Sequence, residues 1–248
     1  MNQILQIRDK MILYILAGLG VCRSIDLSYL AGFNNASYLR RRLSILKKQG
    51  LIATDYLGRE KIYFLTSKGY FQTERTKNSY TINSQTIHDV GVARICTYLY
   101  ITQKVAYADF ITDRQLFYNM VNSGVHRPDI VLGRDCYEYE RTIKKYRYIK
   151  ENVRQNQKYD KQVWGVHSDS RLLKKIPQLA EESFVDNLEL ITYEDIDKYV
   201  RSADLTQNVL RSTACLGERN FKILLQKQTS NKEFDSYFNN NREDSCYD

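Results

Sequence analysis

The pattern of apolar and polar positions changes along the first 65 residues. Apolar residues recur at roughly helical spacing in residues 3–17, 24–31 and 37–49. Two short strand-like runs follow, at 51–57 and 61–65, with a Gly-containing turn between them. The pattern therefore predicts three helices followed by a β-hairpin.

The third predicted helix, residues 37–49, has one apolar and one polar face. Leu39, Leu43 and Leu46 are spaced i, i+4 and i+7 and form a core stripe, and Gly50 is typical of the residue that follows a helix. Hydroxyl and cationic residues occupy the other face and continue at the hairpin tip: Ser37, Arg40, Arg41, Ser44, Lys47, Lys48, Arg59 and Lys61.

This stretch, LSYLAGFNNASYLRRRLSILKKQGLI followed by DYLGREKIYFLTSKG, resembles the winged helix-turn-helix family. The resemblance implies that the third helix enters the major groove of double-stranded DNA. Arg40 and Arg41 would then bond guanine edges, whereas Lys47, Lys48 and the hairpin residues would contact phosphates. Two alternatives stay open: the basic residues form a merely solvated helix face, or the domain binds a protein.

The distribution of charge favours a polyanionic partner. The formal charge is +8, divided as +7 over residues 1–75, +4 over 76–160 and −3 over 161–248. Because cations that neutralise phosphates release counterions, a local basic surplus favours nucleic acid. The alternative is that the surplus serves only solubility.

Composition argues against several other classes of protein. With 43% apolar residues and only 2 Pro, the chain is neither disordered throughout nor collagen-like. No run of about 18 apolar residues and no signal-like start occurs, so we expect neither a membrane span nor secretion. The 5 scattered cysteines, without a CxxC pair, predict reduced thiols in a cytoplasmic protein rather than a zinc finger. No Walker loop, GxGxxG or Ser-His-Asp pattern is present.

The most informative stretch reads HRPDIVLGRDCYEYERTIKK and predicts two strands joined by a turn. In the second strand Glu138 and Glu140 point to one side. If Arg134 and Asp135 form a two-residue loop, Asp129 pairs opposite Glu140, and the three carboxylates share a face. A three-residue loop would shift the register by one and separate Asp129 from the glutamates. The sequence leaves both registers open.

Three converging carboxylates repel one another unless a cation lies between them, and Mg²⁺ or Mn²⁺ prefers such oxygen ligands. A metal held there would polarise a phosphodiester and activate water. The stretch resembles the PD-(D/E)xK nuclease motif, in which RPD supplies the PD and EYE reads ExE. The resemblance implies that Asp129, Glu138 and Glu140 are metal ligands and catalytic residues.

One position departs from that nuclease motif, because Glu140 stands where a lysine is usual. Lys144 or Lys145 of the following segment would then supply the missing cation. The other interpretation is a half-exposed strand whose carboxylates pair with Arg127, Arg141 or Lys144.

A winged helix, then RPD, then YEYERTIKK and a basic helix resembles the replication-relaxation family over roughly residues 5–195. That family occurs on plasmids and conjugative elements and is associated with plasmid replication and relaxation of DNA at mobilisation. The resemblance implies a DNA-binding protein of a mobile genetic element, with a nuclease activity as one option. The alternatives are a homodimeric, non-enzymatic regulator and an adaptor for a relaxase or replication protein.

A helix predicted after the motif suggests a second nucleic-acid surface. Its apolar stripe is Ile143, Tyr146, Ile149 and Val153, and its basic stripe is Arg147, Lys150, Arg154 and Lys158. A solvated helix face explains the basic stripe equally well.

The predicted architecture is α+β followed by α/β, with a winged helix-turn-helix domain before a mixed α/β, PD-(D/E)xK-like domain. The expected boundaries are 1–75 for the first domain, 76–85 for a linker, 86–200 for the second domain, 201–225 for terminal helices and 226–248 for a disordered tail. The second domain is expected to contain a helix at 86–101, strands at 105–111, 129–132, 136–142, 162–167 and 188–192, and a helix at 172–181. Its histidines, at 88, 126 and 167, are dispersed, so a relaxase with a tyrosine nucleophile is not expected.

Overall fold

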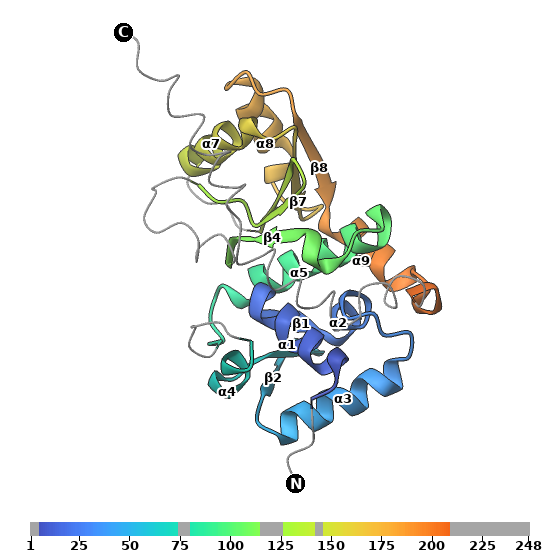
Figure 1. Ribbon diagram of the computed structural model, residues 1–248. Helices are drawn as coiled ribbons and strands as arrows, with labels where there is room; N and C mark the ends of the chain where they lie inside the picture. Colours follow the sequence, from blue (N-terminus) through green and yellow to red (C-terminus); the bar gives the residue numbers. More distant parts are fainter. Residues whose placement is uncertain (1–4, 74–79, 115–125, 142–145, 209–248) are drawn as a thin grey trace.

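The computed structural model describes residues 5–73, 80–114, 126–141 and 146–208, which form an α+β protein with two β-sheets (Figure 1). Lys144, Lys145 and the predicted tail lie outside the described residues, as do residues 76–79 of the predicted linker and most of the predicted terminal helices.

The first part of the chain has the predicted order of three helices and a hairpin, with one additional short strand. A three-stranded antiparallel sheet has the order β1-β3-β2, so β3 is its central strand. The elements are α1 (Ile7–Leu19), β1 (Val21–Arg23), α2 (Ser24–Leu30), α3 (Ala36–Lys48), β2 (Ile52–Leu57), β3 (Glu60–Leu65) and the short α4 (Ser67–Phe71).

Local signals determine where α3 begins and which face it buries. The side chain of Asn35 caps the helix by accepting hydrogen bonds from two backbone N–H groups. Leu39, Leu43 and Leu46 are buried as predicted, and Gly50 takes a φ of 69° just after the helix. The polar face of α3 is therefore left toward solvent.

The second part of the chain forms a five-stranded sheet of order β4-β5-β6-β7-β8. Neighbouring strands from β4 to β6 are antiparallel, whereas β6, β7 and β8 run parallel. The elements are α5 (Thr86–Gln103), β4 (Phe110–Thr112), β5 (Ile130–Leu132), β6 (Asp135–Glu140), α7 (Tyr146–Gln155), β7 (Lys161–Val166), α8 (Leu172–Glu181), β8 (Leu188–Thr192) and α9 (Tyr193–Ser202), with short 3₁₀ helices at η1 (Tyr107–Asp109), η2 (Asn156–Lys158) and η3 (Leu205–Asn208).

The predicted strand at 105–111 is largely wrong. The Asp109 carboxylate accepts a hydrogen bond from the backbone N–H of Ala106 at 2.8 Å and closes a 3₁₀ turn, so the strand begins only at Phe110.

Neither of the two registers considered for the β5–β6 hairpin is correct. Ile130 pairs with Tyr137, so the loop is Gly133-Arg134, and Gly133 takes the positive φ of 61° that the first position of a type II′ turn requires. The register differs from the two-residue alternative by two positions, which preserves the face of every side chain. Asp129 therefore comes opposite Glu138 rather than Glu140.

Helix α5 connects the two sheets. It packs against β1 and α2 on one side and against β6 and α9 on the other. Gly91 of α5 allows this approach, since a Cβ there would lie 2.2 Å from the Tyr139 ring. The opposite face of the second sheet is covered by α7 and α8, whose apolar residues pack on Trp164 and Val166. Within the described residues, no helix is long and apolar enough to cross a membrane.

Candidate functional site around strand β6

All 3 histidines of the chain lie beside a carboxylate and near strand β6. The Nε2 atom of His88 is 3.2 Å from Asp129 Oδ2, and the Nε2 atom of His126 is 2.5 Å from Glu138 Oε1. The Nδ1 atom of His167 is 2.7 Å from Glu194 Oε1. Residues that are dispersed in the sequence are thus gathered by the fold.

Asp129 directly precedes β5 and has two partners. Its Oδ2 accepts a hydrogen bond from the backbone N–H of Tyr139 at 2.7 Å and lies beside His88. Burial alone would lower the pKa of His88, but the charge of Asp129 and hydrogen bonds to Asp129 and Asp89 outweigh it and raise the pKa to about 10. An imidazolium cation therefore lies next to Asp129 at neutral pH.

Glu138 faces the side of the sheet that α7 and α8 cover. Its carboxylate accepts a hydrogen bond from Asn156 Nδ2 at 2.8 Å and is 6% exposed. Burial and the charge of Asp129 raise the pKa of Glu138, against the opposing effect of His126 and Asn156. The site therefore gains stability from a proton or another cation near Glu138.

The predicted group of three carboxylates is brought together in part. Asp129 and Glu138 are close enough for their charges to interact, and Glu140 is buried at the end of β6. Among the side chains that the structure describes, no three His, Cys, Asp or Glu residues form a group that could hold a metal ion. The metal site thus stays a prediction.

A cavity of about 290 Å³ opens beside Asp129. Asp89 in its wall binds Arg114 Nη2 at 2.6 Å and accepts a hydrogen bond from Tyr80 Oη, also at 2.6 Å. Burial would raise the pKa of Asp89, but its contacts with His88 and Arg114 lower it. The cavity is lined by residues of α1, α5 and the ends of β4 and β5: Gly18, Leu19, Gln85, His88, Asp89, Val92, Thr112, Asp113, Arg114 and Asp129.

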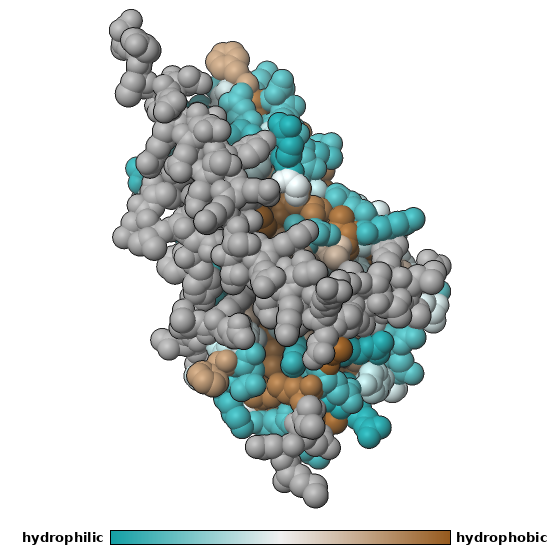
Figure 2. All heavy atoms as spheres, in the orientation of Figure 1, coloured by the Kyte–Doolittle hydropathy of each residue, from teal (hydrophilic) through white to brown (hydrophobic). Residues whose placement is uncertain are grey.

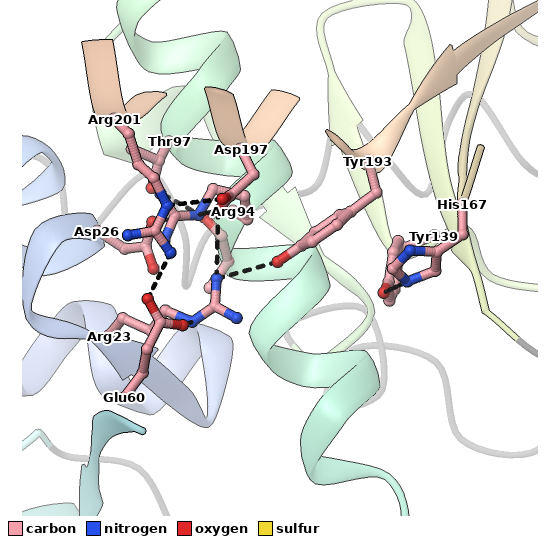
Figure 3. Close-up of polar contacts among 11 residues, drawn as sticks. Arg23, Asp26, Glu60, Arg94, Thr97, Tyr139, His167, Tyr193, Asp197 and Arg201 are labelled. Atoms are coloured by element: carbon pink, nitrogen blue, oxygen red, sulfur yellow. Dashed lines mark hydrogen bonds and ion pairs between the residues drawn. The ribbon is translucent and has the colours of Figure 1, made fainter. Parts of the chain in front are cut away.

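The carboxyl ends of the parallel strands bring together a hydroxyl, an imidazole and a carboxylate. Tyr139 Oη lies 3.0 Å from His167 Nε2 (Figure 3), and the other nitrogen of His167 contacts Glu194. The Tyr139 side chain is 2% exposed, and burial and Tyr193 raise its pKa. Since a nucleophile must be accessible and readily deprotonated, this geometry favours a structural role for Tyr139.

A buried ionic network lies between the first sheet and α9. Arg94 of α5 and Asp26 of α2 are both fully buried, with Arg94 Nε 3.1 Å from Asp26 Oδ1 and 3.5 Å from Asp197 Oδ1. Arg23 Nε binds Glu60 at 2.6 Å and Arg23 Nη1 donates a hydrogen bond to Tyr193 Oη at 3.0 Å (Figure 3). The network ties the hairpin strand β3 to the helix that follows the second sheet.

The residues predicted to bind DNA, on α3 and the β2–β3 hairpin, are accessible to solvent. Ser37, Arg40, Arg41, Ser44, Lys47, Lys48 and Arg59 are exposed and Lys61 is partly exposed. Figure 2 shows hydrophilic side chains along the lower right edge of the molecule, where α3 runs in Figure 1. Arg42 differs from its neighbours, because it is buried and its Nε donates to Asp9 Oδ1 at 2.8 Å. Two of the three consecutive arginines thus remain for a ligand.

The basic stripe of α7 is partly neutralised. Lys150 Nζ is 3.1 Å from Glu182, and Arg154 Nη2 is 3.2 Å from Glu151. Arg147 instead lies over the ring of the neighbouring Tyr148. These contacts weaken the case for a duplex-binding stripe along the whole helix.

Comparisons with protein-family models, curated proteins and solved structures gave no match to this chain. The three histidines and Asn156 are the site residues that sequence reasoning missed. One signal for His167 and Glu194 was present, since His167 ends one predicted strand and Glu194 comes two residues after another, and the carboxyl ends of parallel strands meet at one edge.

Proposed function

We propose that the chain binds double-stranded DNA through α3 and the β2–β3 hairpin. The observation that carries the proposal is the uninterrupted polar and basic face of α3, opposite a face held in the core by three leucines. The order α1-β1-α2-α3-β2-β3 is the order of a winged helix-turn-helix, in which the third helix lies in the major groove.

Each group on this surface has a distinct chemical use. Arg40 and Arg41 present guanidinium groups suited to the O6 and N7 acceptors of guanine. Lys47, Lys48 and Arg59 carry positive charge toward the flanking phosphates, which fixes the position of the protein without reading sequence. The hydroxyls of Ser37 and Ser44 add short hydrogen-bonding groups near the base edges.

A duplex-binding assay tests this proposal. Fluorescence anisotropy with a pool of random-sequence duplexes should give salt-sensitive binding, and R40A/R41A should raise the Kd at least about tenfold. The matched control R134A/K198A removes the same charge from exposed positions outside α3 and should leave the Kd nearly unchanged. Equal losses in both variants would show that charge alone, and not α3, governs binding.

The resemblance to the replication-relaxation family supports a role for this activity on a plasmid or other mobile genetic element. There the protein would act in replication, relaxation or mobilisation, either directly or beside a relaxase or replication protein. A homodimer would place two copies of α3 on neighbouring half-sites. A non-enzymatic regulator shares these features and differs only in lacking chemistry on DNA.

A second candidate function is metal-dependent DNA cleavage, and it is favoured by the proximity of the Asp129 and Glu138 carboxylates, whose charges interact. Burial and, after it, the charge of Asp129 raise the pKa of Glu138, and a divalent cation such as Mg²⁺ or Mn²⁺ between the two carboxylates would relieve their repulsion. The described side chains do not complete a group of three ligands, so the candidate rests on Asp129 and Glu138, with Glu140 as the third ligand that the resemblance implies. An ion held there would polarise a phosphodiester. The sheet order, with antiparallel β4 to β6 followed by parallel strands, suits a PD-(D/E)xK-like domain.

The nuclease candidate is tested with supercoiled plasmid in Mg²⁺ or Mn²⁺. Nicked or linear product that D129A abolishes and D109A retains would support it, as would calorimetric Mn²⁺ binding that D129A removes. Intact plasmid together with undiminished duplex binding would leave the regulator or adaptor as the function.

A further inference from the structure

The α7–α8 surface carries exposed aromatic side chains on a basic background. Tyr146 and Tyr148, in the first turn of α7, are 41% and 50% exposed. A surface tyrosine of this kind offers a ring face to a planar ligand while its hydroxyl stays in water.

Cations lie directly against both rings. Lys175 Nζ of α8 is 5.1 Å from the centroid of the Tyr146 ring, and Arg147 Cζ is 4.8 Å from the centroid of the Tyr148 ring. Lys174 and Arg171 add exposed positive charge on α8 and just before it. Rings and cations therefore alternate on this surface.

The surface is held in place by the core beneath it. Ile149 and Val153 of α7 are fully buried against Leu172 and Ile176 of α8, so the two helices form one unit. Figure 1 shows α7 and α8 at the end of the molecule opposite α3. A ligand bound here would not compete for the α3 surface.

We propose that the α7–α8 surface binds single-stranded nucleic acid, with bases stacked on Tyr146 and Tyr148 and backbone phosphates near Arg147, Lys174 and Lys175. Alternating rings and cations are the features by which proteins hold single strands without reading sequence. A duplex cannot use the rings, because its base faces are covered by neighbouring base pairs. Since Tyr146 and Tyr148 are two positions apart on a helix, they lie on opposite flanks of Arg147, and a single strand that crosses α7 would stack one base on each ring.

The test is anisotropy with a fluorescein-labelled oligo(dT) on the full chain. Y146A and Y148A should each weaken binding about five- to 150-fold, the equivalent of about 1–3 kcal/mol per stacked base. Y146F and Y148F should bind as wild type, because stacking needs the ring and not the hydroxyl. Y199A removes an exposed tyrosine from α9 and serves as the control.

The α3 variant R40A/R41A separates this proposal from the DNA-binding function, because it should lose duplex binding and keep oligo(dT) binding. Wild-type chain that fails to bind oligo(dT), or alanine variants that fold by circular dichroism and bind unchanged, would overturn the proposal. Loss of oligo(dT) binding only in R40A/R41A would place the single strand on α3 and would overturn it as well.

Discussion

Replacing His88 with glutamine removes a buried charge from the cavity beside Asp129. The charged groups that face His88 are Asp89 on the same helix, Arg114 after β4, Asp113 beside it and Asp129 before β5. Glutamine retains hydrogen-bonding capacity but cannot become a cation, so the substitution isolates the effect of protonation.

The magnitude follows from the pKa of His88, which rises from 6.5 in the unfolded chain to about 10 in the folded one. A group whose pKa is raised by folding contributes stability that is complete below the unfolded pKa and is lost as the pH rises through the folded pKa. At about 1.4 kcal/mol per pH unit, the loss between pH 6.5 and pH 10 amounts to about 5 kcal/mol at most.

The assay is urea unfolding of wild type and H88Q at a series of pH values across this window. We expect the difference in the free energy of unfolding between the two chains to shrink steadily as pH rises. In a D129N background, the effect of H88Q on the free energy of unfolding should be smaller at neutral pH, because D129N removes the charge that raises the pKa of His88. A difference that stays constant with pH would refute a cationic His88.

Three further substitutions test other parts of the fold. D26A leaves Arg94 buried without its nearest carboxylate and should cost about 3–5 kcal/mol in urea unfolding; a loss below about 1 kcal/mol would contradict the buried ion pair. G91A places a Cβ against the Tyr139 ring, so the thermal midpoint should fall in line with about 1–3 kcal/mol, whereas an unchanged midpoint would argue against this packing. R42A should lower stability by a similar 3–5 kcal/mol, unlike R41A, and equal stabilities would show that Arg42 is not a core residue.

Sequence patterns predicted the elements well where short-range signals decide them. The helix predicted at 172–181 and the strand at 188–192 match α8 and β8, and the leucine stripe of α3 is buried as expected. In each case the spacing of the apolar residues and the flanking polar residues indicate the same element. The coarse fold class, α+β with two sheets, is confirmed.

The pairing of β5 with β6 was not predictable from the pattern alone. The alternation of side chains fits a loop at Gly133-Arg134 and one at Arg134-Asp135 equally, but only the first places glycine at the position where a type II′ turn requires a positive φ. The convergence of the histidines is also tertiary: His88 comes from α5, His126 precedes β5, and His167 follows β7. No short-range sequence signal indicates that these three positions lie close together in the fold.

The salt dependence of duplex binding tests the central claim most directly. Each phosphate contact contributes about 0.9 to the slope of log K against log salt concentration. Binding through α3 and the hairpin predicts a steep slope in wild type and a slope smaller by about 2 in K47A/K48A. A wild-type chain whose duplex affinity ignores salt, or a K47A/K48A variant with the wild-type slope, would contradict the assignment of α3 as the DNA-binding surface.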